Sequence, residues 1–222
     1  MMTRALRRDP SGALTLALPR GALFEGCLTM LDRAGFDTTD LRGGSRALVF
    51  ELDGLTIVTV RPSDVPTYVE SGAADLGVTG KDVLAEQDDR KVYELVDLGF
   101  GRCRMALAAR AGGTDLERAE RRFGLMRIAT KYPRTADAYF ERVGRQAEVI
   151  EVKGSVELAP VVGLADGIVD LVDSGRTLAE NGLEVVDEIA ASSARLIANR
   201  VAHKLRADEV DAMVDRLREA AP

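Results

Sequence analysis

The sequence predicts an α/β protein, with helices packed on mixed or mostly parallel sheets. Apolar runs typical of strands alternate with segments of helical spacing along most of the 222 residues. An eight-residue pattern also occurs twice, which favours two similar lobes. The length allows either one large domain or two small lobes, and the sequence has no low-complexity segment that would mark a flexible linker.

Short apolar runs bounded by turn residues predict the strands. In order, they are Ala13–Leu18, Ala47–Leu52, Leu55–Val60, Asp75–Val78, Val92–Leu98, Arg104–Ala109, Met126–Thr130, Ala147–Val152 and Ile168–Val172, followed by a strand-rich stretch at Glu184–Ala198. Asp53-Gly54 separates the second strand from the third and favours a tight hairpin between them.

Segments with apolar residues three or four positions apart predict the helices. In order, they are Gly21–Ala34, Ser63–Glu70, Lys81–Glu86, Pro133–Val143, Ser155–Val162, Ser174–Asn181 and the stretch from Asn199 to the end. Gly35 and Gly182 are typical helix stops, and Pro133 is a typical first helical residue. The polar segment Ala111–Arg122 fits a loop or a short helix.

Composition excludes several classes of function. The formal charge is −6 and the charged residues are mixed along the chain, which argues against a nucleic-acid partner. No apolar run reaches the length of a membrane span or of a signal peptide, so the cytoplasm is expected. Cys27 and Cys103 are expected to be reduced thiols. His203 is the single histidine, and its polar surroundings favour neither a metal site nor a catalytic triad.

The repeated pattern lies at Ala74–Lys81 and Val169–Arg176. Each copy has Asp-Leu, two further residues, a hydroxyl residue, Gly and a base. This order predicts a strand, a tight turn and a helix whose free amides and dipole favour an anion. Alternatively, Thr79 and Ser174 only cap helices. Two copies favour two lobes that each present a helix terminus to a shared ligand.

The second copy carries the richer chemistry. Asp170 and Asp173 flank the strand end that precedes Ser174–Thr177. Carboxylates beside a phosphate cradle are unfavourable unless they hold something else, and ribose hydroxyls or a magnesium-bound water would suit them. The loop is therefore predicted to bind a sugar phosphate.

Longer segments around these residues resemble one family. Gly163–Leu178 is similar to the phosphoribosyl-pyrophosphate loop of ATP phosphoribosyltransferases, and Lys153–Pro160 is similar to its lead-in. Asp64–Gly77 and Ile128–Tyr132 match further segments of that family. The likeness continues in order from about Leu14 to the last helix, and such an ordered series of matches is highly specific.

The resemblance implies a two-lobed, periplasmic-binding-protein-like (type II) fold with central mixed or parallel sheets and an active-site cleft between the lobes. The chain is expected to cross between lobes near residues 100 and 187. Residues 1–100 and 187–222 would form lobe I, on the ATP side, with the C-terminal helix packed back on it. Residues 101–186 would form lobe II, which carries the phosphoribosyl-pyrophosphate loop.

The resemblance also implies a reaction, the first step of histidine biosynthesis. A phosphoribosyl group would pass from phosphoribosyl pyrophosphate to N1 of ATP, giving phosphoribosyl-ATP and pyrophosphate. Mg²⁺ would be carried by the substrates, without a metal site of the protein's own. Positioning two polyanions and neutralising the leaving group would drive this displacement. A non-catalytic bilobal solute-binding or sensor protein is the alternative, and another sugar-phosphate enzyme is a third reading.

Partners follow from the same resemblance. The chain ends at Pro222, directly after the last predicted helix, so it is expected to be the family's short form, without a histidine-binding domain. Such subunits form homodimers and hetero-oligomers with a regulatory protein that resembles a histidyl-tRNA synthetase.

The family's second-lobe loop holds the 5′-phosphate of the donor. The resemblance assigns phosphoribosyl-pyrophosphate binding to Glu157, Asp170, Asp173, Ser174, Gly175, Arg176 and Thr177. Backbone amides should do most of the phosphate binding, so Arg176 is expected to be replaceable. Asp170 and Asp173 are expected on the ribose side, and the alternative for Glu157 is a solvated charge on a helix surface.

ATP and pyrophosphate are expected on the side of the first lobe. The resemblance assigns ATP binding to Arg20, Gly21, Arg46, Thr79, Gly80 and Lys81, and catalysis to Arg20, Arg46 and Lys131. Arg46 would stabilise the charge that builds on pyrophosphate, and the alternative is a solvated arginine before a strand. The family often has Lys-Gly-Arg where this chain has Arg20-Gly21-Ala22, so one cation is missing, with Arg42 and Arg61 as candidate substitutes.

Overall fold

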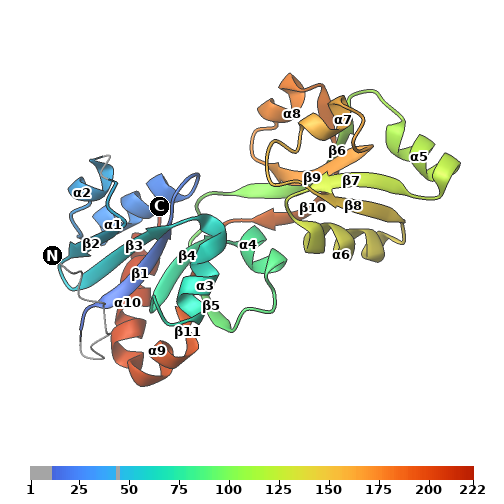
Figure 1. The fold of residues 1–222 in the computed structure, drawn as a ribbon. Coiled ribbons are helices and arrows are strands. Elements are labelled where there is room, and N and C mark those ends of the chain that lie inside the picture. Colours follow the sequence, from blue (N-terminus) through green and yellow to red (C-terminus); the bar gives the residue numbers. More distant parts are fainter. Residues whose placement is uncertain (1–11, 44–45) are drawn as a thin grey trace. The chain divides into compact units, whose positions relative to one another are not determined.

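The computed structural model describes residues 12–43 and 46–222, which form two compact units with one sheet each (Figure 1). The first unit contains the described residues up to Gly80 together with Asp89–Phe100 and Ala194–Pro222. The second contains Lys81–Asp88 and Gly101–Ser193.

These limits differ from the expected ones at two places. Lys81–Asp88 belongs to the second unit because the Glu86 carboxylate accepts hydrogen bonds from the amides of Arg134 and Thr135 at 2.9 and 3.0 Å. The second crossing lies at Ser193 rather than near residue 187, because the last long strand stays paired within the second unit as far as Ser192.

The first unit is built on a mixed sheet. Its strands are β1 (Leu14–Pro19), β2 (Val49–Leu52), β3 (Leu55–Val60), β4 (Leu76–Gly80), β5 (Val92–Asp97) and β11 (Ala194–Asn199). Its helical elements are α1 (Phe24–Arg33), α2 (Thr39–Arg42), the 3₁₀ turn η1 (Pro62–Asp64), α3 (Val65–Glu70), α9 (Arg200–Leu205) and α10 (Ala207–Ala220). The strand order is β2-β3-β1-β4-β11-β5, in which β1 is parallel to β3 and β4 and the other pairs are antiparallel.

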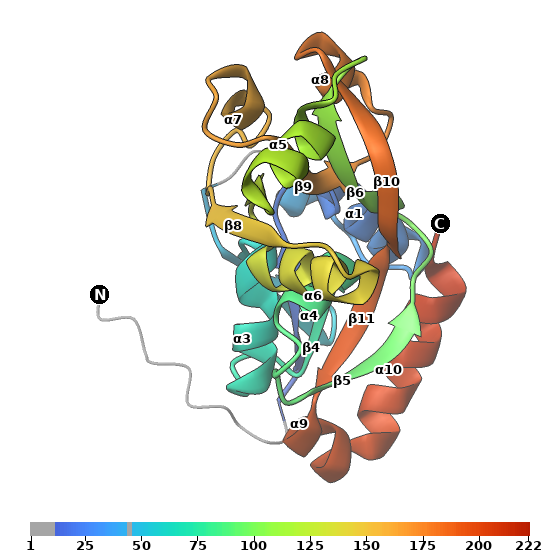
Figure 2. The same ribbon diagram turned by 90° about the vertical axis from the view of Figure 1, so that its right-hand side faces the viewer.

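Helices cover both faces of this sheet (Figure 2). On one face α1 and α10 bury an apolar core against β1. On the other face α3 lies directly on Gly77, where an added Cβ would come within 2.7 Å of both Val65 and Val69. Because only glycine leaves room for that approach, Gly77 sets how closely α3 packs on β4.

The second unit has its own mixed sheet. Its strands are β6 (Cys103–Arg110), β7 (Met126–Thr130), β8 (Ala147–Glu151), β9 (Gly167–Val172) and β10 (Leu183–Ser192). Its helices are α4 (Lys81–Glu86), α5 (Asp115–Phe123), α6 (Pro133–Val143), α7 (Leu158–Val161) and α8 (Arg176–Glu180). The strand order is β10-β6-β9-β7-β8, in which β7 is parallel to β8 and β9, and β6 is antiparallel to its two neighbours.

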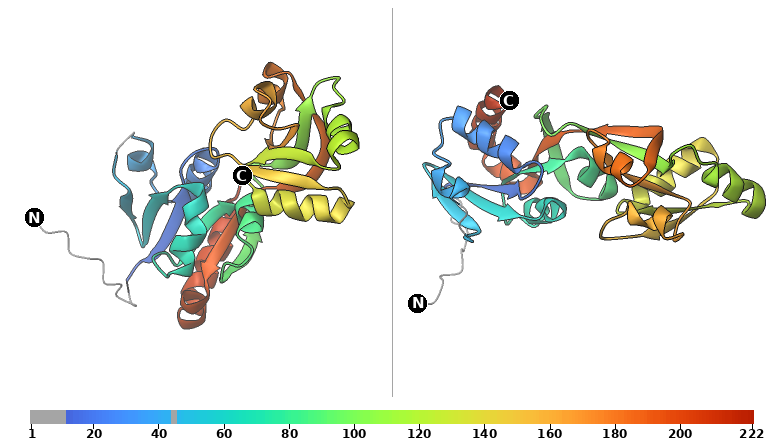
Figure 3. Two further views of the ribbon diagram at one scale, coloured as in Figure 1. Left: turned by 45° about the vertical axis from the view of Figure 1, so that its right-hand side comes forward. Right: turned by 90° about the horizontal axis from the view of Figure 1, so that it is seen from above.

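Successive residues of β6 point into two different cores. Met105 and Leu107 pack with α5 and α6, whereas Ala106 and Ala108 pack with α7 and α8. Figures 1 and 3 show α6 on one side of the strands and α7 and α8 on the other. A strand covered on both faces loses the polar alternation of a surface strand, which is why β6 is apolar from Met105 to Ala109 and β9 is apolar apart from Asp170.

Most predicted elements are confirmed with ends that shift by a few residues. Leu52 pairs with Leu55 across the predicted Asp53-Gly54 turn, where Gly54 has a φ of +73°. The segment left open at Ala111–Arg122 contains a helix, α5, and the strand-rich stretch separates into β10 and β11. Within the described part of the chain, no helix combines the length and hydrophobicity needed to cross a membrane.

Asn199 joins three segments of the first unit. Its side-chain Oδ1 accepts hydrogen bonds from the amides of Val201 and Ala202 at 2.9 and 2.8 Å, which caps α9. Its Nδ2 donates to the carbonyls of Val69 and Glu70 at 2.7 and 3.2 Å, at the end of α3. A buried side chain whose donors and acceptors are all used ties α3 to α9.

We therefore expect Asn199→Ala to destabilise the protein by about 2–4 kcal/mol, since it removes a cap and leaves buried backbone groups unpaired. Chemical unfolding followed by circular dichroism measures this loss. The matched control is Asn181→Ala, because the exposed Asn181 Nδ2 makes a single bond to the Thr177 carbonyl at 2.8 Å. An equal loss of unfolding free energy in the two variants would contradict the proposal that Asn199 holds α3 and α9 together.

Candidate functional site

The loop that follows β9 has the geometry of an anion site. Gly175 has a φ of +78° and directly precedes α8. Among the described residues, the amides of Ser174, Gly175 and Thr177 have no hydrogen-bond acceptor, and the amide of Arg176 has only the Ser174 hydroxyl at 3.4 Å. Unpaired amides at the start of a helix are ready donors for a phosphate.

Lys131, Glu157 and Asp170 lie close enough to interact electrostatically, although they are distant in sequence. Burial raises the pKa of Asp170, the Leu171 amide and the Lys131 charge oppose that shift, and the Glu157 charge adds to it. Lys131 and Asp170 come directly after Thr130 and Val169, which are paired in the parallel strands β7 and β9. Carboxyl ends of adjacent parallel strands are a common place for ligands to bind.

A second polar cluster in the same unit was missed by sequence reasoning. Asp82 accepts hydrogen bonds from the Ser192 hydroxyl at 2.7 Å and from the Tyr132 hydroxyl at 3.4 Å. Burial and then the Asp82 charge raise the pKa of both Tyr132 and Cys103, and the Asp173 charge contributes at Cys103. No local pattern marks this cluster, because its members come from four separate segments.

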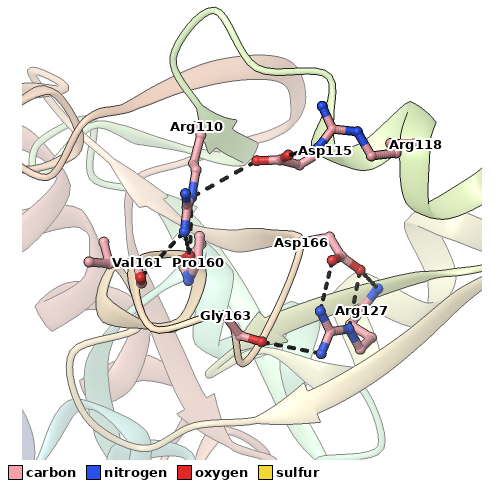
Figure 4. A network of polar contacts seen from close by, with 8 residues as sticks. All are labelled: Arg110, Asp115, Arg118, Arg127, Pro160, Val161, Gly163 and Asp166. Atoms are coloured by element: carbon pink, nitrogen blue, oxygen red, sulfur yellow. Dashed lines mark hydrogen bonds and ion pairs between the residues drawn. The ribbon is translucent and has the colours of Figure 1, made fainter.

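Two arginines brace the segment that leads into β9 (Figure 4). The Arg127 guanidinium donates to Asp166 Oδ1 at 2.9 Å and to the Gly163 carbonyl at 3.2 Å. Arg110 donates to the Pro160 carbonyl from Nε at 3.1 Å. We therefore infer a structural role for Asp166, since its carboxylate fixes the turn between α7 and β9.

In the first unit, Arg20 and Gly21 lie where β1 ends. Arg20 donates from Nε to the Thr59 hydroxyl at 3.1 Å and from Nη2 to the Ala47 carbonyl at 2.9 Å. Gly21 has a φ of +106°, and its carbonyl accepts the Phe24 amide at 2.9 Å. Arg46 is exposed before β2, and no hydrogen bond or ion pair joins its side chain to the described residues.

The prediction of a tight turn in the first copy of the repeat is wrong. Thr79 and Gly80 remain in β4, and α4 begins at Lys81 without a loop. The reason is long-range pairing, because Gly80 lies opposite Ala194 on β11. Thr79 is fully buried and its hydroxyl is 3.5 Å from the Pro62 carbonyl, so the anion-loop geometry belongs to the second copy.

Of the two substitutes considered for the missing cation, Arg42 is engaged elsewhere. Its guanidinium pairs with Asp32 at 2.7 Å and with Glu25 at 2.9 Å. Arg61 is exposed at the start of η1. Arg20 is thus the cation that the first unit holds in a defined orientation next to Gly21.

The chain is similar to known proteins of one enzyme family. The family model "HisG: ATP phosphoribosyltransferase" matches residues 61–219. An ATP phosphoribosyltransferase of Rubrobacter xylanophilus is 54% identical over 211 residues, covering 94% of this chain and 97% of that protein. One from Symbiobacterium thermophilum is 49% identical, covering 93% and 94%.

Solved structures agree on the fold. The "ATP phosphoribosyl transferase (HisG:HisZ) complex" of Thermotoga maritima matches with a TM-score of 0.77 and 36% identity, covering 94% of this chain and 98% of that chain. The periplasmic aliphatic sulphonate binding protein SsuA of Escherichia coli matches with a TM-score of 0.60 and 13% identity, covering 95% and 72%. These matches confirm the predicted two-lobed, periplasmic-binding-protein-like fold.

The Asp166–Arg127 pair generates a pH prediction. Burial alone would raise the pKa of Asp166, but the hydrogen bonds and charge of Arg127 bring that pKa below its usual value. A carboxyl with a lowered folded-state pKa stabilises the fold above its unfolded pKa of about 3.9, and the stabilisation disappears as the pH falls through the folded pKa.

Asp166→Asn is therefore expected to cost about 1–2 kcal/mol at pH 7, and the difference from wild type should shrink as the pH falls below about 4. Urea unfolding across that range measures it. Asp215→Asn serves as the control, because Asp215 pairs with Arg218 on the exposed surface of α10 and such pairs contribute little. A loss that is constant from pH 7 to pH 3 would rule out the ion pair as its source.

Proposed function

Because the chain belongs to the ATP phosphoribosyltransferase family, we propose that the loop after β9 binds the 5′-phosphate of phosphoribosyl pyrophosphate. The enzyme transfers the phosphoribosyl group to N1 of ATP and releases pyrophosphate, the first step of histidine biosynthesis. The following roles are proposed for the residues that contact the phosphate, the ribose, ATP and the leaving pyrophosphate.

The observation that carries the assignment is the unpaired amides of Ser174, Gly175 and Thr177, which follow the strand that holds Asp170 near Lys131 and Glu157. The amides of Ser174, Gly175 and Thr177 would donate to the phosphate oxygens, with the Ser174 and Thr177 hydroxyls as further donors. Because backbone groups dominate, the Arg176 side chain adds only charge.

The ribose is proposed to lie over the carboxylates that precede this loop. Asp170 and Asp173 would accept hydrogen bonds from the 2′- and 3′-hydroxyls, and Glu157 would assist from the start of α7. Burial raises the pKa of Asp170, and the charge of Lys131 opposes that shift. Lys131 would stabilise negative charge that develops as the bond to pyrophosphate breaks.

ATP and the departing pyrophosphate are proposed to use Arg20, Gly21 and Arg46 of the first unit, with Lys81 as a further cation. Since the side chain of Thr79 is buried, Thr79 and Gly80 would contribute only backbone contacts. The reaction is a displacement at the anomeric carbon. The N1 lone pair of ATP forms the new C–N bond, and the pyrophosphate oxygen leaves with the electron pair of the C–O bond that breaks. Positioning both polyanions would supply most of the rate enhancement.

Mg²⁺ is proposed to arrive with the phosphates. Across residues 12–43 and 46–222, no group of three or more histidine, cysteine or acidic side chains could hold a metal ion. The donor set therefore fits an ion that is mainly coordinated by pyrophosphate, with Asp170 or Asp173 contacting its water shell. Such an ion would offset the charge of the leaving group.

A regulatory partner is proposed from the structural comparison. The similar chain of Thermotoga maritima was solved in a HisG:HisZ complex. We expect this chain to form homodimers and to assemble with a HisZ-type protein that resembles a histidyl-tRNA synthetase. A biosynthetic enzyme of this kind would act in the cytoplasm.

The first experiment measures pyrophosphate release from the purified protein with ATP, phosphoribosyl pyrophosphate and Mg²⁺, together with the ultraviolet absorbance of the adduct. We expect release that needs both substrates, either from the chain alone or after a HisZ-type subunit is added. Binding of the donor without release under both conditions would contradict the catalytic assignment.

Gly175→Ala tests the phosphate loop. An added Cβ would meet only Val172 Cγ1 at 3.9 Å, so the variant should fold, with about 1 kcal/mol of backbone strain from its positive φ. The methyl group would keep a phosphate away from the amides, and we expect the Kd for phosphoribosyl pyrophosphate to rise at least about tenfold.

Gly182→Ala is the matched control at the other end of α8. Gly182 has a φ of +67° and open space around its Cα, so the strain is similar and no phosphate contact is lost. Calorimetric titration of both variants separates strain from ligand contact. An equal Kd for phosphoribosyl pyrophosphate in the two variants would contradict the proposal that this loop binds the phosphate.

A further inference from the structure

Three separate parts of the first unit hold the Arg20 side chain. Nε donates to the Thr59 hydroxyl at the end of β3, at 3.1 Å. Nη2 donates to the Ala47 carbonyl before β2, at 2.9 Å. The ring of Phe24, the first residue of α1, lies 5.8 Å from the guanidinium carbon. Arg20 is exposed, and these three contacts restrict the rotamers that its side chain can adopt.

Thr59 is an unusual residue for its position. Buried and half-buried residues alternate along β3, and Thr59 follows Leu55 and Ile57 on the buried face. It is 2% exposed. Its hydroxyl accepts from Arg20 and lies 3.5 Å from the Leu48 carbonyl. Valine would fill this place equally well, so the hydroxyl is the part of the residue that packing does not explain.

The contacts leave one side of the guanidinium available. Nη1 has no acceptor among the residues that the structure describes, whereas Nε and Nη2 are both used. Since a guanidinium is planar, fixing two of its nitrogens also fixes the direction in which the third donates. The direction in which Nη1 donates is thus fixed before a ligand binds.

We propose that Thr59 is a positioning residue for the reaction, because it locks Arg20 so that Nη1 meets a phosphate oxygen of ATP or of the leaving pyrophosphate. The inference rests on the proposed function, which places Arg20 on that side. A cation whose orientation is fixed beforehand stabilises developing charge without a further ordering cost.

The test is a double-mutant cycle on Thr59 and Arg20. Thr59→Val keeps the shape of the side chain and removes only the hydroxyl. We expect kcat/KM for ATP to fall about ten- to a hundredfold, which is the typical effect of losing one charged hydrogen bond. Thr59→Ser keeps the hydroxyl and should restore most of the activity. In an Arg20→Lys background, which lacks Nε–H, Thr59→Val should cause no further loss.

Thr56→Val is the matched control on the same strand. The Thr56 hydroxyl bonds to the exposed Glu51 carboxylate at 2.7 Å, away from Arg20, so this variant should keep wild-type kinetics. All variants are assayed by pyrophosphate release, with a HisZ-type subunit added, and their unfolding midpoints are compared.

The outcomes separate the two levels of the assignment. Wild-type protein that releases no pyrophosphate overturns the proposed function and the role of Thr59 with it. Active wild-type protein with Thr59→Val as active as Thr56→Val overturns the positioning role alone. The same loss from Thr59→Val in the wild-type and Arg20→Lys backgrounds would make Thr59 a packing residue and also overturn it.

Discussion

The placement of β9 is the constraint on which the second unit depends, because this strand is paired on both edges and covered on both faces. Its first residue must be glycine, since an added Cβ would lie 2.9 Å from a methyl of Leu116 and 3.0 Å from the Ala108 carbonyl oxygen. The buried Thr130 hydroxyl donates to the Val169 carbonyl at 2.6 Å. With its register fixed in this way, β9 delivers Asp170 beside Lys131 and turns at Gly175.

Local signals predicted this part of the fold well. Short apolar runs bounded by turn residues marked β7 and β9, and Pro133 marked the first residue of α6, because both signals depend on nearby residues. The same logic failed at Gly80. Its neighbours resemble those of Gly175, but β11 supplies a pairing partner more than a hundred residues away in the chain. Tertiary pairing decides the conformation there, and a local pattern does not contain that information.

The residues of the candidate site also divide into those that a local pattern predicts and those that depend on distant segments. The loop Ser174–Thr177 could be predicted because its donors are consecutive backbone amides. The partners of Arg20 could not, since Thr59 is 39 residues away and Ala47 is 27 residues away. The contact between Tyr132 and Asp82 spans 50 residues. Side-chain contacts between separate segments form only once the sheet has folded, and the local pattern of a single sequence gives no sign of them.

The chain carries 30 basic and 36 acidic residues, a net charge of −6, and on the proposed assignment it places only some of its cations against the two polyanions. On the proposed assignment, uncharged amides of the second unit bind the phosphate that is unchanged by the reaction. The cations Lys131 and Arg20 then face groups whose charge grows as pyrophosphate departs. Binding the unchanged phosphate with dipoles and the changing one with fixed charges favours the transition state over the ground state. A cation whose orientation is fixed before the reaction stabilises the growing charge without a further ordering cost, which is the physical reason to expect a hydroxyl at Thr59.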